Sequence, residues 1–124
     1  MEGLEEKLIR QISALQPDSN NSFVARLPKI RQMVKAIENR GGRVLFVKMP
    51  SSGLIENYEQ KKYPRELFWD PMISIAGVNG IRAADEPTLR TFNCPDGSHL
   101  DMRDRTEFTK RLVKTLHLSK TSPQ

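Results

Sequence analysis

The segment GGRVLFVK, residues 41–48, sets the expected fold class. Its glycine pair, Gly41 and Gly42, suits the end of a helix, because glycine readily adopts the left-handed conformation found at many helix C-termini. Residues 43–48 are apolar without alternation, which is typical of a strand covered on both faces. A helix, a glycine turn and a buried strand in this order predict a parallel α/β unit.

Helical spacing predicts two helices before this strand. One covers residues 28–39, with Pro28 in its first turn and a buried face made of Ile30, Met33, Val34 and Ile37. The other is an amphipathic helix over residues 3–15, and the polar run at residues 18–22 is expected to end it and act as a linker. Its apolar stripe consists of Leu4, Leu8, Ile9, Ile12 and Leu15.

Shorter elements are expected after the strand. Residues 50–53 form a loop, and 54–60 stay open between helix and loop. A helix is predicted over 64–69 and is ended by Pro71, while 73–75 fit either a helix end or a short strand. A weak strand at 80–84, a short helix at 87–91 and a loop at 93–98 follow.

The final helix has the clearest start signal. Asp101 is a good N-cap, and Asp104 three residues later completes a pattern similar to a capping box. Residues 119–124 are expected to form a flexible tail, so that residues 1–118 make one domain. The predicted buried face of this helix consists of Phe108, Leu112, Val113 and Leu116.

Composition excludes several classes of protein. The chain has 124 residues, two histidines and one cysteine, Cys94, so neither an internal disulfide nor a tetrahedral zinc site is expected, and no cofactor is implied. No apolar run reaches the length of a membrane helix, and no signal peptide is visible. The chain as it stands is therefore expected in the cytoplasm, whereas a fragment of a longer exported protein could reside elsewhere.

The segment Asp96-Gly97-Ser98-His99 carries the clearest chemical pattern. It places a carboxylate three residues before a histidine, in a tight loop that leads into a helix. A carboxylate that accepts from one imidazole nitrogen fixes the tautomer, and the other nitrogen can then take a proton from a nucleophile. A histidine near a helix start is also typical of an ordinary surface or capping residue, and this alternative stays open.

Asp-x-x-His-Leu at residues 96–100 resembles the last sequence block of the SGNH (GDSL-like) hydrolases. The strand ending at Lys48, the segments 63–65 and 68–70 and the closing helix strengthen a resemblance to the C-terminal half of this family, bacterial members included, over residues 28–116. It implies a three-layer α/β/α fold with a short, mainly parallel sheet, as in part of an SGNH or flavodoxin-like domain. The implied chemistry is hydrolysis or transfer of a small acyl ester, with His99 as general base and Asp96 as its orienting partner.

The family's nucleophile block, Gly-Asp-Ser, is missing. Pro17-Asp18-Ser19 is similar to it but follows a helix instead of a strand, and Gly77-Val78-Asn79-Gly80 only partly matches the family's Gly-x-Asn-Asp block. The nucleophile therefore stays open, and the chain is expected to be a fragment or a shortened relative with weak hydrolase activity or none.

Two further residues are candidates for substrate binding. Ser52 follows the predicted strand, and sites in parallel sheets form at the carboxyl ends of strands. It is also a candidate nucleophile, although Ser-Ser-Gly after a strand is typical of a turn or helix cap. Arg65 could hold a carboxylate or an oxyanion, and its alternative is a solvated helix residue.

Two alternatives to an enzyme remain. A sheet of two or three strands leaves an open edge, so a second copy of the chain or a missing N-terminal segment is expected to cover it, as in a non-catalytic interaction module. The net charge of +5 also suits a nucleic-acid-binding domain, but the basic residues are scattered, and this alternative is the less favoured one.

Overall fold

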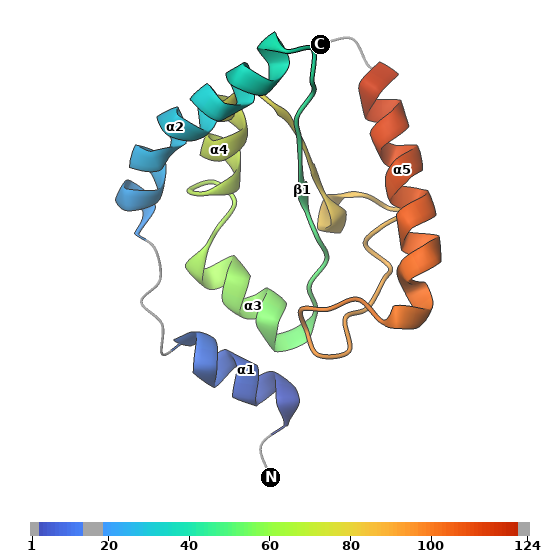
Figure 1. The fold of residues 1–124 in the computed structure, drawn as a ribbon. Helices are drawn as coiled ribbons and strands as arrows, with labels where there is room; N and C mark the ends of the chain where they lie inside the picture. Colours follow the sequence, from blue (N-terminus) through green and yellow to red (C-terminus); the bar gives the residue numbers. More distant parts are fainter. Residues whose placement is uncertain (1–2, 14–18, 122–124) are drawn as a thin grey trace.

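Two parallel strands lie at the centre of the protein (Figure 1). The computed structural model describes residues 3–13 and 19–121. In it, β1 (Leu45–Lys48) pairs with β2 (Asn79–Arg82) in parallel, with Leu45 opposite Asn79 and Lys48 opposite Arg82. Both predicted strands are present with shorter bounds, and the small α/β fold expected from the sequence is confirmed.

Helices surround this sheet. The described part of the chain forms α1 (Leu4–Ser13), α2 (Asn20–Asn39), α3 (Gly53–Lys62), α4 (Trp69–Ala76) and α5 (Arg105–Thr121), with 3-10 turns η1 (Ala83–Asp85) and η2 (Met102–Asp104). None of these helices is long and apolar enough to cross a membrane.

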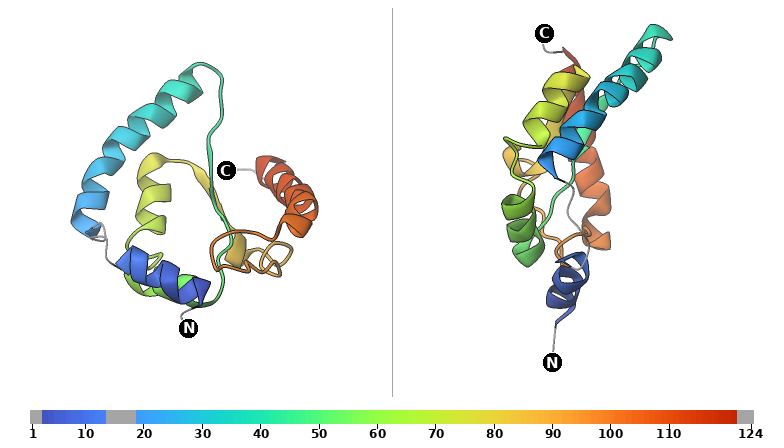
Figure 2. Two further views of the ribbon diagram at one scale, coloured as in Figure 1. Left: turned by 60° about the horizontal axis from the view of Figure 1, so that its bottom comes forward. Right: turned by 90° about the vertical axis from the view of Figure 1, so that its left-hand side faces the viewer.

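Helices cover both faces of the sheet (Figure 2). On one face α4 approaches β2 so closely that a Cβ atom on Gly80 would lie 2.7 Å from Trp69 Cζ2, and α2 packs on the outside of α4. On the other face Ile81 is buried in a cluster with Leu89 and with Phe108 of α5. Successive residues of one strand thus contact different helix layers, which gives the α/β/α arrangement.

The buried core is small. Among the described residues it consists of Leu27, Val34, Ile55, Ala76, Ile81, Ala83, Leu89, Cys94 and Phe108. The broader buried faces expected on the second and the last helix are wrong in part, because Met33, Ile37 and Val113 are 57%, 40% and 47% exposed. Helix α2 packs chiefly on α4, so a narrow stripe containing Leu27 and Val34 is sufficient there.

Helix α2 starts earlier than expected. Ser19 is its N-cap, and the Ser19 hydroxyl accepts a hydrogen bond from the Ser22 backbone N–H at 3.0 Å. The polar run expected to be a linker therefore begins a helix, and Pro28 lies inside it instead of in its first turn. The predicted end is confirmed: Gly41 has a φ of 86° and the Gly42 N–H donates to the Ile37 carbonyl at 3.0 Å.

The expectations for residues 54–91 need three corrections. Residues 53–62 are helical, which settles the open assignment, whereas 65–68 form a turn and 87–91 form turns instead of helices. Pro71 does not end a helix but lies in the first turn of α4, where a backbone N–H has no intrahelical partner. Residues 73–75 belong to α4, and Gly77, with a φ of 69°, ends it.

The last helix differs from its expected bounds. Helix α1 is described over Leu4–Ser13, within the expected 3–15, and packs on α3, whereas the positions of Leu15 and Pro17 lie outside the described residues, as do the side chains of Leu8 and Ile12. Helix α5 continues to Thr121, into the segment expected to be a tail. Asp101 acts as the predicted cap, because its carboxylate accepts from the Arg103 N–H at the start of η2.

Candidate functional site

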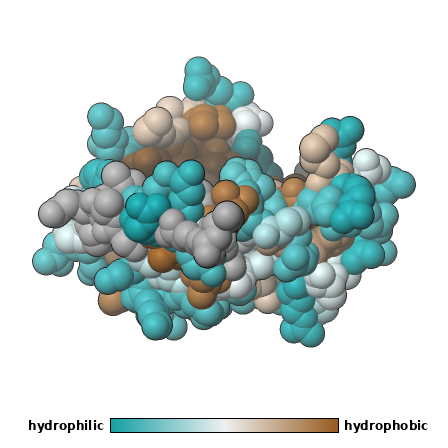
Figure 3. Space-filling model, turned by 90° about the horizontal axis from the view of Figure 1, so that it is seen from below, coloured by the Kyte–Doolittle hydropathy of each residue, from teal (hydrophilic) through white to brown (hydrophobic). Residues whose placement is uncertain are grey.

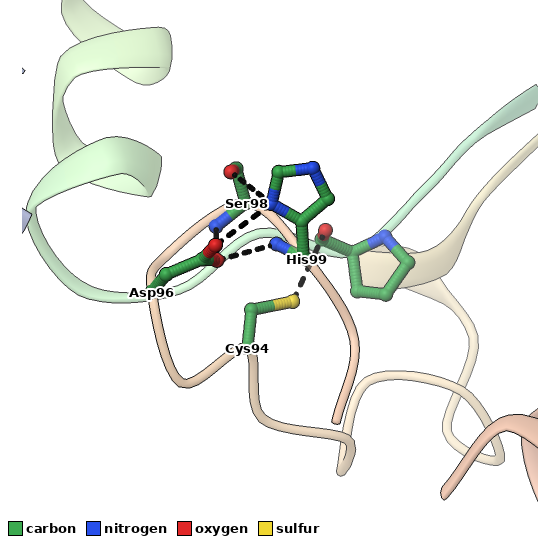
Figure 4. Close-up of polar contacts among 5 residues, drawn as sticks. Cys94, Asp96, Ser98 and His99 are labelled. Carbon is green, nitrogen blue, oxygen red and sulfur yellow. Dashed lines mark hydrogen bonds and ion pairs between the residues drawn. The ribbon is translucent and has the colours of Figure 1, made fainter. Parts of the chain in front are cut away.

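The loop before η2 folds tightly around the Asp96 carboxylate (Figure 4). Its turn depends on Gly97, which has a φ of 89° and donates its N–H to the Cys94 carbonyl at 2.9 Å. Asp96 Oδ1 accepts hydrogen bonds from the Ser98 N–H at 2.9 Å and from the His99 N–H at 2.7 Å. The backbone therefore fixes the carboxylate next to the imidazole.

Asp96 and His99 form a hydrogen-bonded pair. Asp96 Oδ2 lies 2.7 Å from His99 Nδ1, and the Ser98 hydroxyl lies 3.1 Å from the same nitrogen. Because an ionised carboxylate only accepts hydrogen bonds, the proton of the neutral imidazole is on Nδ1, and Nε2 is left as the proton acceptor. That nitrogen points away from the other labelled residues, and the His99 side chain is 81% exposed.

Asp96 stays ionised across the neutral range. Hydrogen bonds from the Ser98 and His99 backbone N–H groups and from the imidazole lower the Asp96 pKa from 3.8 to about 2. The arrangement is that of a base and its orienting partner, as the sequence pattern predicts. That His99 and Asp96 are catalytic stays a prediction.

Ser52 connects this loop to the end of β1. Its N–H donates to the Gly97 carbonyl at 2.9 Å, and its hydroxyl oxygen accepts from the Cys94 N–H at 3.0 Å. The Cys94 thiol donates to the Pro50 carbonyl at 3.4 Å, and burial raises its pKa. Cys94 is 3% exposed, so it serves as a packed thiol and not as a reactive thiolate.

Ser52 and Arg65 both line a cleft at the carboxyl ends of the two strands. The cleft has a volume of about 970 Å³ and also includes the strand ends Lys48 and Arg82. The two substrate-binding candidates predicted from the sequence therefore lie in the same cleft, although they come from different parts of the chain. The Asp96–His99 pair is not among the lining residues, and Ser52 is the connection between the cleft and the loop that carries this pair.

The Arg65 guanidinium already holds two carboxylates. Its Nη1 lies 3.1 Å from Asp85 Oδ2, and its Nε lies 3.5 Å from Asp70 Oδ1. Substrate binding by Arg65 stays a prediction, but a ligand would have to compete with these partners. Ser52 is the N-cap residue of α3 by position, without a hydrogen bond from its side chain to the helix.

Sequence reasoning missed the charged groups at the strand ends. Lys48 Nζ lies 2.8 Å from Glu59 Oε2, which also accepts from the Ser51 hydroxyl at 3.0 Å. Arg82 ends β2 directly opposite Lys48. The sequence signal that could have identified these groups is a cationic residue at the end of each strand. No group of three or more His, Cys, Asp or Glu side chains in the described ranges is placed to hold a metal ion.

Neither a protein-family model nor a curated protein nor a solved structure matches this chain.

Proposed function

We propose that the Asp96–His99 pair is the acid–base centre of an SGNH-like acyl hydrolase or acyltransferase that acts on a small acyl ester. The observation that carries the proposal is the 2.7 Å contact between Asp96 Oδ2 and His99 Nδ1, with Nε2 exposed. Asp96 would hold the tautomer and stabilise the imidazolium that forms when Nε2 takes a proton.

The chemistry proceeds in two steps. Nε2 of His99 takes the proton of a serine hydroxyl as its oxygen bonds to the ester carbonyl carbon, and the imidazolium then returns the proton to the departing alkoxide. Water or another hydroxyl attacks the resulting acyl-serine in the same way, and the serine is released with its proton. The products are the acid, or a new ester, and the free alcohol.

The proposed chemistry requires a nucleophilic serine. No hydroxyl of the described residues is hydrogen-bonded to His99 Nε2: Ser98 contacts Nδ1, and Ser19 caps α2. Ser52 is the candidate in this chain, because it lines the cleft at the strand ends and its loop is hydrogen-bonded to the dyad loop. We expect weak activity, since the loss of even one oxyanion donor typically costs about 10²–10³ in rate.

The two histidines of the chain allow a matched test with p-nitrophenyl acetate. We expect the parent to release p-nitrophenol faster than buffer, His99→Ala to fall to the buffer rate, and Asp96→Asn to lie between them. His117, exposed on α5, is the control, and His117→Ala should retain the parent rate. Equal rates in the parent and His99→Ala, or no turnover in either, would contradict the proposal.

A second candidate function is supported by the surface. The exposed area of the chain is 8785 Å², whereas a compact protein of 14.2 kDa exposes about 6,800 Å². The excess of about 2,000 Å² is larger than the roughly 800 Å² that each partner buries in a standard protein interface. Hydrophobic areas are visible among hydrophilic ones in Figure 3, and Met33, Leu67 and Met102 are exposed.

We therefore also propose an interaction module whose partner is a second copy of the chain. In the described residues β1 and β2 pair only with each other, so each strand has one edge without a strand partner. Light scattering across a range of concentrations should show a dimer that dissociates on dilution. A monomer at every concentration would contradict the interaction proposal and leave the dyad proposal untouched.

A further inference from the structure

The cleft at the strand ends contains an arginine that lacks a close partner. Arg82 is 21% exposed, and the shortest ion pair it makes is a 3.8 Å approach of Nη1 to Asp85 Oδ1, which is too long for a hydrogen bond. Its Nε atom is buried and has no hydrogen-bond acceptor among the residues that the structure describes. Buried donors of this kind are uncommon in folded proteins and call for an explanation.

Asp85 does not satisfy Arg82 because it is committed to Arg65. The Asp85 carboxylate lies 3.1 Å from Arg65 Nη1, and Asp70 approaches Arg65 Nε as well. Asp85 and Asp70 thus both pair with Arg65, and Arg82 is left without a carboxylate at hydrogen-bond distance. Arg90 also lines the cleft and is exposed, without an ion pair to any described residue.

We propose that the cleft binds one oxyanion group, a carboxylate or a phosphate, through Arg82 and Arg90. Asp85 approaches only Nη1 of Arg82, at 3.8 Å, so this guanidinium has no carboxylate within hydrogen-bond distance among the described residues, and guanidinium groups make strong charge-assisted hydrogen bonds to carboxylate and phosphate oxygens. The inference does not rest on the proposed function, since neither Arg82 nor Arg90 has a role in the acid–base chemistry proposed for the dyad.

Carboxylates elsewhere in the cleft limit the ligand to one anionic end. Glu56 and Glu59 of α3 and Glu66 of the turn before α4 line it too, and of these Glu59 is neutralised by Lys48 at 2.8 Å. Glu56 and Glu66 would repel a second negative charge. The ligand therefore places its anionic group at the end of β2 and a neutral part along α3.

The arginine Nε–H resonances in a ¹H–¹⁵N spectrum of the full chain test this directly. Inorganic phosphate and sodium acetate are titrated separately, and sodium chloride at matched ionic strength serves as the reference. The Arg82 Nε–H signal, assigned by its loss in Arg82→Lys, should shift and saturate with at least one of the two anions but not with chloride. The anion that saturates first identifies the ligand chemistry.

Variants locate the site. Arg90→Ala removes an exposed side chain and should weaken anion binding about tenfold or more, because charge-assisted hydrogen bonds are among the strongest. Arg103, 89% exposed and bonded to Asp101 outside the cleft, is the control, and Arg103→Ala should leave the affinity unchanged. An Arg82 signal that does not saturate with either anion, or equal weakening in Arg103→Ala, would overturn the proposal.

Discussion

Ser52→Ala should weaken the connection between the β1 loop and the dyad loop, in which the bond from the residue 52 N–H to the Gly97 carbonyl remains. The Ser52 hydroxyl accepts from the Cys94 N–H, lowers the pKa of the Cys94 thiol through a side-chain hydrogen bond, and makes no hydrogen bond to α3, so the contacts that the substitution removes are those to Cys94. The Cys94 N–H then lacks its hydrogen-bond acceptor, and Cys94 is only 3% exposed. A buried donor left without a partner costs about 1–3 kcal/mol.

That free energy predicts a measurable change in thiol reactivity. Cys94 is the single cysteine of the chain, and it is buried and bonded to the Pro50 carbonyl, so a disulfide reagent reaches it only when the loops separate. A cost of 1–3 kcal/mol raises the population of the open state by roughly 5- to 150-fold. The rate of labelling under native conditions should rise by the same factor.

Ser19→Ala provides the matched control. It also removes one serine-to-backbone hydrogen bond, at the N-terminus of α2, and a lost cap typically costs about 1 kcal/mol. Its urea midpoint should fall while Cys94 labelling in the absence of urea stays at the parent rate. Parent-like labelling in Ser52→Ala, or equal acceleration in Ser19→Ala, would refute the idea that Ser52 holds the two loops together.

Two further predictions concern packing and pH. Gly80→Ala should lower the free energy of unfolding by about 1–3 kcal/mol in urea titrations, because the new Cβ would clash with Ile73 Cδ1 and lie 2.7 Å from Trp69 Cζ2. Adding Ile73→Ala to the same chain removes the first of these clashes and should recover part of the loss. An unchanged free energy of unfolding in Gly80→Ala would show that α4 can move away from β2. Asp96, with a folded pKa of about 2 against 3.8, stabilises the folded chain above pH 3.8, and this contribution is lost as the pH falls through 2. The melting temperature should therefore drop over this range less steeply in Asp96→Asn than in the parent, and parallel curves would contradict the assignment.

The sequence predicted the features that depend on local patterns. The glycine pair at 41–42 ends a helix because its signal is contained in two residues, and Asp96 meets His99 because a turn of four residues brings them together. Polar runs are ambiguous, since Ser and Asn favour both loops and helix caps, and this ambiguity caused the linker assignment at Ser19. Pro71 was misread for a similar reason, because proline fits a first helical turn as well as a helix end.

Features that depend on distant contacts could not be predicted. The pairing of Asp85 with Arg65 instead of Arg82 follows from the placement of the turn before α4 beside η1, which no local pattern records. The Ser52–Cys94 hydrogen bond joins residues that are 42 positions apart. The cleft therefore emerges only when β1, α3 and β2 have assembled.

The hydrolase proposal depends on local contacts, whereas the anion-binding proposal depends on distant ones. The Asp96–His99 pair is made within one turn, so its geometry does not require a complete active site and is compatible with a chain that hydrolyses esters poorly. The Arg82 site requires the packed sheet and the competition of Arg65 for Asp85, so it reports on the assembled fold. Anion binding at Arg82 without His99-dependent turnover would mean that the cleft is a binding site and that the hydrolase proposal is wrong. His99-dependent turnover without anion binding would assign the chemistry to the dyad loop and leave Arg82 and Arg90 without a part in substrate binding.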